Sequence, residues 1–384
     1  RSVAGWERGC RYMSLLKVGI TGQSGFIGYH LVQRLRLHPD EIEIVPFDTK
    51  FFQNSERMER FVSQCDVIVH LAAMNRGPDG EVYATNVELV ECLIAALEHV
   101  KHASYVIFAS SIQEARDSAY GRSKRRGTQL LQAWADKNNA HYTSLIIPNV
   151  FGPFGRPFYN SVVGTFCYQL THGQEPIIEI DAPLSLISVM DLSKEMLEAI
   201  RNGHDEPVVH IAATSEMKVS EILHRLVEFK DSYLDLHIVP KLEGPIDVAL
   251  FNTFRSYIEP DHFPVYPEVH ADNRGHLAEV LKELSGGQVF FSMTKPGITR
   301  GNHYHMRKIE RFCVIQGEAM IRLRKIGTDN IIEYRVQGSA PSFIDIPIYY
   351  THNITNIGAT NLLTLFWTNE LFDAHDPDTF PESV

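Results

Sequence analysis

The sequence predicts two domains of different classes: a doubly wound α/β domain of the Rossmann type, followed by an all-β jelly-roll domain. Three observations predict this arrangement. In the first half, short runs of β-branched residues alternate with helical patterns, which is typical of a parallel sheet with helices on both faces. A glycine-rich turn follows the first of these strands. From about residue 265, strand-like segments follow one another without a convincing helix between them, as in an antiparallel barrel or jelly roll.

Length and composition place the chain among globular proteins. Its 384 residues correspond to two or three domains at about 150 residues each, and 44% apolar and 22% charged residues are ordinary values. The net charge of −11 disfavours nucleic acid or an anionic membrane as the main partner, because both require a basic surface. The sequence contains no apolar stretch long enough to span a membrane, so we expect a cytoplasmic protein.

The first domain is predicted element by element from this alternation. Residues 1–13 precede the pattern and lack the apolar core of a secretory signal, so we interpret them as an N-terminal extension or tag. Strands are expected at 17–21, 41–47, 66–73 and 104–111, and helices from the glycine-rich turn to about Leu37, at 55–64 and at 87–100. The helix at 87–100 repeats apolar residues at i, i+3 and i+4, which places them on one face.

The second domain is predicted as a series of strands separated by Gly, Pro and Asn. The pattern changes within residues 256–269, which carry three prolines. The sequence therefore predicts a first domain over residues 14–258, a linker over 259–265 and a second domain over 266–384. Its strands are expected at 287–294, 310–325, 331–338, 342–347 and 361–369.

Three glycines follow the first strand at the spacing G-x-x-G-x-x-G. The first two permit a tight turn whose backbone N–H groups approach a pyrophosphate, and the last lets the helix pack closely on the strand. Asp48, after the second strand, is the candidate for the ribose 2′-hydroxyl and favours NADH, whereas Lys50 would meet the 2′-phosphate of NADPH. The turn itself predicts a dinucleotide site formed by Gly22, Ser24, Gly25, Phe26, Ile27 and Gly28.

A tyrosine and a lysine form the pattern Y-x-x-x-K at Tyr120 and Lys124, so on a helix they share one face. A lysine cation beside a phenol lowers the phenol pKa from about 10 toward neutral pH. Such a tyrosine can protonate a carbonyl oxygen as a hydride arrives at the carbon. Ser110 or Ser111, at the end of the preceding strand, can hydrogen-bond the same oxygen, and we favour Ser111.

The chain has 18 histidines, and spacing singles out three of them. His303 and His305 alternate on a predicted strand and share one face. Glu310 and His352 can reach the same point from neighbouring strands. Two or three imidazoles with one carboxylate suit Zn, Fe, Mn or Ni. The sequence therefore predicts a divalent metal, with Zn²⁺ as the first choice, at these four residues. The alternative is a barrel interior in which the same groups hydrogen-bond one another.

The motifs of the first domain, in this order, resemble the extended short-chain dehydrogenase/reductase superfamily. The resemblance rests on TGQSGFIG, DVIVHLAA, TNVELV, YGRSK and PNVFGP. The two serines lie only nine or ten residues before Tyr120, a shorter gap than the superfamily usually shows. The resemblance implies a small substrate lobe for nucleotide sugars and a nicotinamide cofactor that contacts Leu71, Ala72, Ala73, Asn86, Lys124 and Asn149.

The histidine spacing resembles the two cupin motifs, with Tyr349 in place of the usual glycine of the second motif. Over nearly all of residues 14–384 the chain resembles the CapF-like capsular polysaccharide enzymes, most closely in KPGITRGNHYH, IPIYYTHNITNIG, FYNSVVGTFCY and NELFDAHDPDTF. Phe47 stands where members of that family have a basic residue, so the choice between NADPH and NADH stays open.

This second resemblance implies a bifunctional homodimer that acts on a UDP-4-keto-6-deoxy-N-acetylhexosamine. The cupin domain would epimerise C3 of a UDP-2-acetamido-2,6-dideoxy-hexos-4-ulose. The reductase domain would then reduce C4 with NADPH to UDP-N-acetyl-6-deoxy-L-talosamine, on the route to UDP-N-acetyl-L-fucosamine.

Two other functions fit the same motifs. A monofunctional nucleotide-sugar 4-ketoreductase could use its cupin domain only for sugar binding or dimerisation. A metal-dependent cupin oxygenase could be tethered to a nucleotide-binding module, and it would consume oxygen with iron bound.

Overall fold

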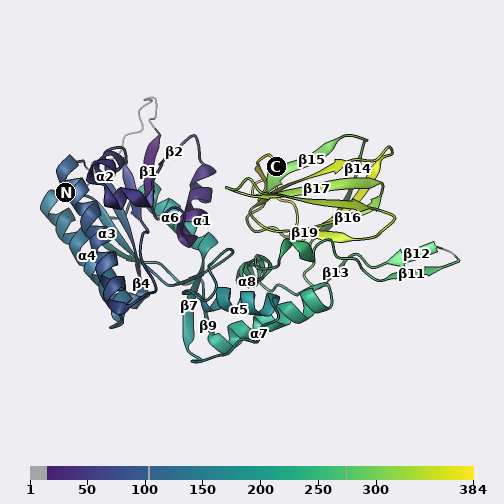
Figure 1. Cartoon of the computed structure of the whole chain (residues 1–384), viewed down its shortest axis with the longest axis horizontal. Helices are drawn as coiled ribbons and strands as arrows, with labels where there is room; N and C mark the ends of the chain where they lie inside the picture. Colours follow the sequence, from purple (N-terminus) through teal and green to yellow (C-terminus); the bar gives the residue numbers. More distant parts are fainter. Residues whose placement is uncertain (1–14, 103, 274) are drawn as a thin grey trace. The chain divides into compact units, whose positions relative to one another are not determined.

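The structure, a computed structural model, describes residues 15–102, 104–273 and 275–384 (Figure 1). The expected N-terminal extension over residues 1–13 lies outside the described residues. Contacts divide the chain into two compact units. The first ends at Val150 and resumes over Val189–Ala213, and the second comprises Phe151–Ser188 and Thr214–Val384. The domain limits at residues 258 and 266 stay predictions. Among the described residues, no helix is long and apolar enough to cross a membrane.

A six-stranded parallel sheet forms the centre of the first unit. Its strand order is β2-β1-β3-β4-β5-β8, and every neighbouring pair is parallel. The order reverses between β1 and β3, and doubly wound sheets bind ligands at the carboxyl ends of the strands at such a point. The α/β prediction is therefore confirmed. The strands are β1 (Leu16–Thr21), β2 (Ile42–Val45), β3 (Val67–His70), β4 (Tyr105–Ser111), β5 (Tyr142–Ile147) and β8 (Val208–His210).

Helices cover this sheet in two groups: α1 packs with α6, and α3 packs with α2 and α4 (Figure 1). Helix α3 begins at Asp79 rather than at the expected residue 87. Pro78 precedes its first turn, where Asp79 and Glu81 place negative charge at the positive end of the helix. The helices are α1 (Phe26–Arg36), α2 (Ser55–Val62), α3 (Asp79–Val100), α4 (Ala119–Asn138) and α6 (Val189–Asn202), with 3₁₀ turns η1 (Thr49–Gln53) and η2 (Ile112–Ala115).

The second unit begins as a small helical lobe. Strands β7 (Pro183–Ser188) and β9 (Ser215–Lys218) pair antiparallel. Apolar side chains of the lobe helices form a core that also takes in Ile309 and Trp367 from the all-β part of the chain. The lobe and the all-β part are thus packed around shared apolar contacts. The remaining lobe elements are β6 (Asn149–Phe151), α5 (Val162–Thr171), α7 (Val219–Phe229), the π-helical turn η3 (Lys230–Asp235), β10 (Ile238–Val239), α8 (Pro245–Arg255) and η4 (Pro260–His262).

The rest of the second unit is all β, which confirms that prediction. Two sheets, ordered β14-β21-β16-β19 and β18-β17-β20-β15-β22, enclose a core that includes Phe312, Ile321, Ile354 and Phe366. The strands are β14 (Gln288–Thr294), β15 (Thr299–Tyr304), β16 (Glu310–Gln316), β17 (Glu318–Lys325), β18 (Ile331–Gln337), β19 (Phe343–Ile346), β20 (Tyr350–Asn356), β21 (Leu362–Thr368) and β22 (Phe380–Pro381).

Two features of this part differ from the expectation. The single strand expected at 310–325 is wrong: Gly317, with φ of 92°, divides it into β16 and β17, which belong to different sheets. A hairpin of β11 (Val269–Asp272) and β12 (Gly275–Ala278) precedes the barrel (Figure 1), and β13 (Lys282–Glu283) pairs with β10 of the lobe.

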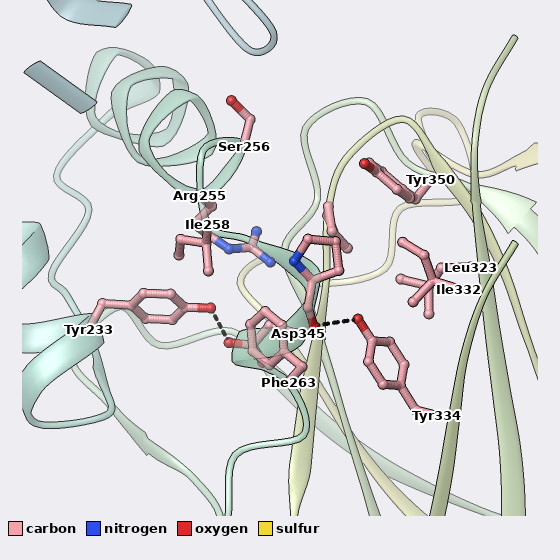
Figure 2. A pocket seen from close by; sticks show the side chains of 12 residues that line it. Tyr233, Arg255, Ser256, Ile258, Phe263, Leu323, Ile332, Tyr334, Asp345 and Tyr350 are labelled. Atoms are coloured by element: carbon pink, nitrogen blue, oxygen red, sulfur yellow. Dashed lines mark hydrogen bonds between the residues drawn. The ribbon is translucent and has the colours of Figure 1, made fainter. Parts of the chain in front are cut away.

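A buried ion pair of the barrel is also hydrogen-bonded to the lobe. Arg311 of β16 contacts Asp345 of β19 through two bonds, Nε to Oδ1 at 2.6 Å and an Nη to Oδ2 at 2.8 Å. Tyr233 of the lobe donates its hydroxyl proton to the same carboxylate, and Figure 2 shows this contact together with the nearby Arg255 side chain. Burial acts to raise the pKa of Asp345, but the charge of Arg311 outweighs it and lowers the pKa. The carboxylate therefore stays ionised and fixes the two parts together.

We expect Arg311→Met to destabilise the protein by about 3–5 kcal/mol, because it leaves a buried carboxylate without its cation. The matched control is Arg322→Met, which breaks the exposed pair with Glu333 and should cost less than about 1 kcal/mol. Urea denaturation measures both free energies of unfolding. Equal losses in the two variants would contradict the role given to the buried pair.

Candidate functional site

The glycine-rich turn takes the conformation that its spacing predicts. Gly22 has a φ of 76°, and a Cβ placed there would lie 3.0 Å from the backbone nitrogen of Ala72. A Cβ on Gly28 would lie 2.2 Å from the carbonyl oxygen of Gly22. Both positions therefore exclude side chains. Gly25 precedes α1, while Ser24 is exposed and Phe26 and Ile27 are half-buried in its first turns.

A hydrogen-bonded chain connects this turn to the end of β3. The backbone N–H of Ala72 donates to Thr21 Oγ1 at 3.3 Å, and Thr21 Oγ1 in turn lies 2.8 Å from His70 Nδ1. The Thr21 hydroxyl therefore links the segment after β3 to the His70 ring. Burial, with a smaller contribution from the charge of Lys124, lowers the pKa of His70 to about 3. His70 is therefore a neutral ring that holds the turn against Leu71, Ala72 and Ala73.

The side chain of Asn86 in α3 forms hydrogen bonds with the segment that follows β3 and with helix α4. Its amide oxygen accepts the N–H of Met74 at 2.6 Å, and its amide nitrogen donates to the Met74 carbonyl and to Ser123 Oγ, each at 2.9 Å. Ser123 Oγ donates to the carbonyl of Tyr120 at 2.7 Å. The side chain thus ties the segment after β3 to helix α4. Its contact with a cofactor stays a prediction, as does that of Asn149 in β6.

Asp48 lies beyond β2 and caps the short helix η1. Its Oδ1 accepts the backbone N–H of Lys50 at 2.9 Å, and its side chain is exposed. Phe47, just before it, is buried against Phe51, Phe52 and Phe61. The structure therefore gives Asp48 a local capping role, and its contact with a ribose stays a prediction.

The structure brings Tyr120 and Lys124 together on α4. Lys124 is only 3% exposed, and its ammonium donates to the carbonyl of Ala109 at 2.7 Å. The ammonium lies 4.8 Å from the centre of the Phe108 ring and 5.7 Å from that of Tyr120. Burial lowers the pKa of Lys124 to about 8, while the carboxylate of Glu114 acts to raise it. The cation is therefore present at neutral pH beside the phenol.

The two candidate serines have different surroundings. Ser110 is buried and donates its hydroxyl proton to Glu114, which also accepts the hydroxyl proton of Thr128. Ser111 is half-buried, and its oxygen accepts the backbone N–H of Gln113 at 3.2 Å. The choice of Ser111 as the serine that contacts substrate stays a prediction. Sequence reasoning missed Glu114, because nothing in the pattern marks a carboxylate between strand and helix.

The four predicted metal ligands form one cluster inside the barrel. Candidate ligand atoms of His303, His305, Glu310 and His352 all lie within 4.8 Å of one another. Glu310 Oε2 lies 3.2 Å from Nε2 of both His305 and His352, close to the spacing of about 3.4 Å between ligands of a tetrahedral ion with 2.1 Å bonds. Burial acts to raise the pKa of Glu310, but His305 and His352 outweigh it and hold the pKa well below its usual value.

Backbone carbonyls orient two of these rings. His305 Nδ1 faces the carbonyl of Asp378, and His352 Nδ1 lies 3.2 Å from that of Tyr350. A carbonyl only accepts, so each Nδ1 carries a proton, and each ring turns its Nε2 toward Glu310. His352 Nε2 is buried and makes no hydrogen bond, despite its 3.2 Å distance from Glu310. Burial, with the neighbouring imidazoles, also lowers the pKa of His303 to about 4. These residues fit a divalent metal.

Two family descriptions match the chain. Residues 18–212, about half of the chain, match the NAD dependent epimerase/dehydratase family, and residues 270–380 match the polysaccharide biosynthesis C-terminal domain. A Pseudomonas aeruginosa protein described as UDP-2-acetamido-2,6-beta-L-arabino-hexul-4-ose reductase is 32% identical over 96% of this chain and 99% of its own length. The chain belongs to the NAD-dependent epimerase/dehydratase family and, within it, to the CapF-like enzymes.

Solved structures agree with this assignment. The capsular polysaccharide assembling protein CapF from Staphylococcus aureus is 34% identical, with a TM-score of 0.61 over 96% of this chain and 100% of that one. RMD from Pseudomonas aeruginosa, solved with NADPH, is 17% identical with a TM-score of 0.54, over 63% of this chain and 99% of that one. At that identity the second comparison shows only a shared fold.

Tyr349, which stands where the second cupin motif usually has glycine, has a glycine-like backbone conformation. Tyr349 has a φ of 59°, in the left-handed region that favours glycine, which accounts for the glycine that the cupin motif usually has here. In this CapF-like chain the ring is fully buried, stacks near Tyr304 and meets Phe154 of the lobe edge-on. The side chain thus joins lobe and barrel at a position where glycine would leave a void.

Sequence reasoning missed Asp378, which holds the segment around His305. Its carboxylate accepts the backbone N–H groups of Met306, Arg307 and Lys308 at 2.8–3.2 Å, and its carbonyl faces His305 Nδ1. Asp378 is buried and has a φ of 43°. The C-terminal tail therefore fixes one predicted ligand from 73 residues away in sequence.

We expect Asp378→Ala to lower the affinity for Zn²⁺ by about 10- to 100-fold, the usual effect of removing a group that orients a metal ligand. The control is Asp373→Ala in the same tail, whose carboxylate accepts the N–H of His375. Competition with a chromophoric chelator measures both affinities. Equal affinities of the two variants would show that the tail does not orient the ligand.

Proposed function

We propose that the protein is a bifunctional UDP-sugar enzyme of polysaccharide biosynthesis. Its barrel epimerises C3 of UDP-2-acetamido-2,6-dideoxy-hexos-4-ulose, and its reductase domain reduces the C4 ketone with NADPH to UDP-N-acetyl-6-deoxy-L-talosamine. The observation that carries the proposal is the presence of two separate buried charged sites in one chain, at Lys124 and at Glu310. The name of the Pseudomonas aeruginosa relative, a reductase of a UDP-4-keto sugar, supports the same substrate class.

The reduction requires a proton donor beside a developing alkoxide. Tyr120 gives its hydroxyl proton to the C4 oxygen, and the Lys124 cation favours the phenolate that remains. Ser111 donates a hydrogen bond to the same oxygen. The Gly22–Gly28 turn would hold the nicotinamide cofactor, which would supply the hydride. Ala109 and Phe108 hold the lysine in place, so that its charge stays within reach of the tyrosine.

The epimerisation uses the acidity of C3, whose proton lies next to the ketone. Removing it places negative charge on the C4 oxygen, and a proton then returns on the other face. A divalent ion at His303, His305, Glu310 and His352, with Zn²⁺ as our first choice, would supply positive charge to such an oxygen. The chain's own contribution is to keep Glu310 ionised and to orient the two rings through backbone carbonyls.

We further propose a homodimer formed through β14. Val289, Phe291 and Met293 alternate along this strand and are 54%, 69% and 57% exposed. Among the described residues β14 pairs only with β21, so it lies at the edge of its sheet. An exposed apolar edge strand is an association surface, and a second copy would cover it.

Tyr120→Phe should lower NADPH oxidation with the 4-keto sugar by at least about 100-fold, because the proton donor is lost. His303→Ala should leave reduction of the C3-epimerised ketone intact. Stopped assays at 340 nm with the two ketones measure both effects. Full reductase activity in Tyr120→Phe would refute the assignment of the acid.

The reduction rate should fall as the pH rises through about 8. The pKa of Lys124 is lowered to about 8, so the cation is present below that pH and is lost above it. A pH profile of kcat at saturating sugar and cofactor measures this, and Lys124→Met should lack the activity at every pH. A rate that stays flat or rises up to pH 10 would contradict a role for the cation.

Phe291→Glu should convert the dimer into a monomer, because it places a charge in the apolar face. Ile331→Glu is the control: it is also an exposed apolar residue, on the edge strand β18 of the other sheet, and should leave the dimer unchanged. Sedimentation velocity distinguishes the two. Dimers in both variants would show that β14 is not the interface.

A further inference from the structure

A cavity of about 460 Å³ lies on the outer side of helices α3 and α4. Asp79, Gly80 and Tyr83 of α3 line it, with Arg122, Arg125, Arg126 and Gln129 of α4. We refer to these seven residues as the arginine cavity. None of its residues has a role in the proposed reactions.

The arginine cavity carries a local positive charge in a protein with a net charge of −11. Arg122 pairs with the exposed Asp117 at 2.9 Å. Arg125 donates to a backbone carbonyl, that of Glu114, at 3.0 Å. Within the part of the chain that the structure describes, no carboxylate forms an ion pair with Arg125 or Arg126. Two guanidinium groups therefore face solvent across the cavity without an anionic partner.

The arginine cavity lies on the side of α4 that faces away from the catalytic pair. At 3.6 residues per turn, or about 100° per residue, Tyr120 and Lys124 share one face of the helix. Arg122, Arg125 and Arg126 lie about 100–160° around the helix from them. Burial follows the same division: Lys124 is buried, whereas the three arginines are exposed. A ligand in the cavity would therefore leave Tyr120 unobstructed.

The kinds of side chain in the cavity match one class of ligand. Guanidinium groups bind phosphate oxygens through paired N–H donors, and residues three and four apart on a helix lie about 5–6 Å from each other. Three such groups suit two linked phosphates better than one. The Asp79 carboxylate can accept protons from sugar hydroxyls, and the Tyr83 ring, 37% exposed, offers a flat surface for a sugar or a base.

We propose that the arginine cavity is a second ligand site, which binds a nucleoside diphosphate, free or attached to a sugar. The site is separate from the reductase and epimerase centres, and it does not depend on the reactions assigned to them. Its ligand contacts the back of the helix that carries Tyr120 and Lys124.

Calorimetric titration of UDP into the full-length, NADPH-saturated protein at low ionic strength tests the proposal. We expect the double variant Arg125→Gln/Arg126→Gln to bind one UDP fewer per chain than the wild type. The matched control, Lys101→Gln/Lys137→Gln, removes the same charge at the other end of α3 and α4 and should keep the wild-type stoichiometry. Both arginines are exposed, so the variant should keep the wild-type melting temperature and rate of NADPH oxidation.

An unchanged number of UDP sites in the arginine variant would overturn the proposal. If that variant alone also lost binding to phosphatidylglycerol vesicles, the cavity would be a membrane contact. If its sedimentation coefficient changed instead, the cavity would be an interface between copies. Because the readout is binding, failure of the proposed catalytic function would not imitate any of these results.

Discussion

A charged group can stay inside a protein only where fixed partners replace the water that it loses. Lys124 meets this condition through one carbonyl, that of Ala109, and one aromatic face, that of Phe108. The partners come from β4 and the charge from α4, so the contact fixes the helix on the sheet. The phenol of Tyr120, four residues earlier, takes its position from the same contact. The proposed reductase site thus depends on how one ammonium is buried.

The same constraint shapes the barrel site. Glu310 is a buried carboxylate, and its neighbours are imidazoles whose outer nitrogens face backbone carbonyls. One of those carbonyls belongs to Asp378 in the C-terminal tail, whose carboxylate also accepts three backbone N–H groups of the segment around His305. The two sites suit successive steps on one substrate. A C4 ketone makes the C3 proton removable, and the same ketone is the group that a hydride can reduce.

The features that could be predicted from the sequence are those that depend on residues close together in the chain. The positions of Gly22 and Gly28 follow from a turn that brings the chain close to itself, and that requirement is visible within a few residues. The spacing of Tyr120 and Lys124 places them on one helical face, and the alternation of His303 and His305 places them on one side of a strand. The parallel α/β character of the first part and the all-β character of the second part followed from periodicity in the same way.

Contacts between distant segments could not be predicted from the sequence. Asp378 reaches His305 across 73 residues, and Tyr233 reaches Asp345 across 112 residues; neither pair shares a periodic pattern. The break at Gly317 was missed because the residues on both sides favour strands equally.

The central claim is that the barrel is itself an epimerase. Its most direct test is the incubation of the metal-loaded protein with the UDP-4-keto sugar in D₂O without reduced cofactor, followed by NMR. We expect deuterium at C3, lost when the metal is removed and regained with Zn²⁺. The absence of label at C3, in a preparation that still reduces the ketone with NADPH, would contradict an epimerase role for the barrel.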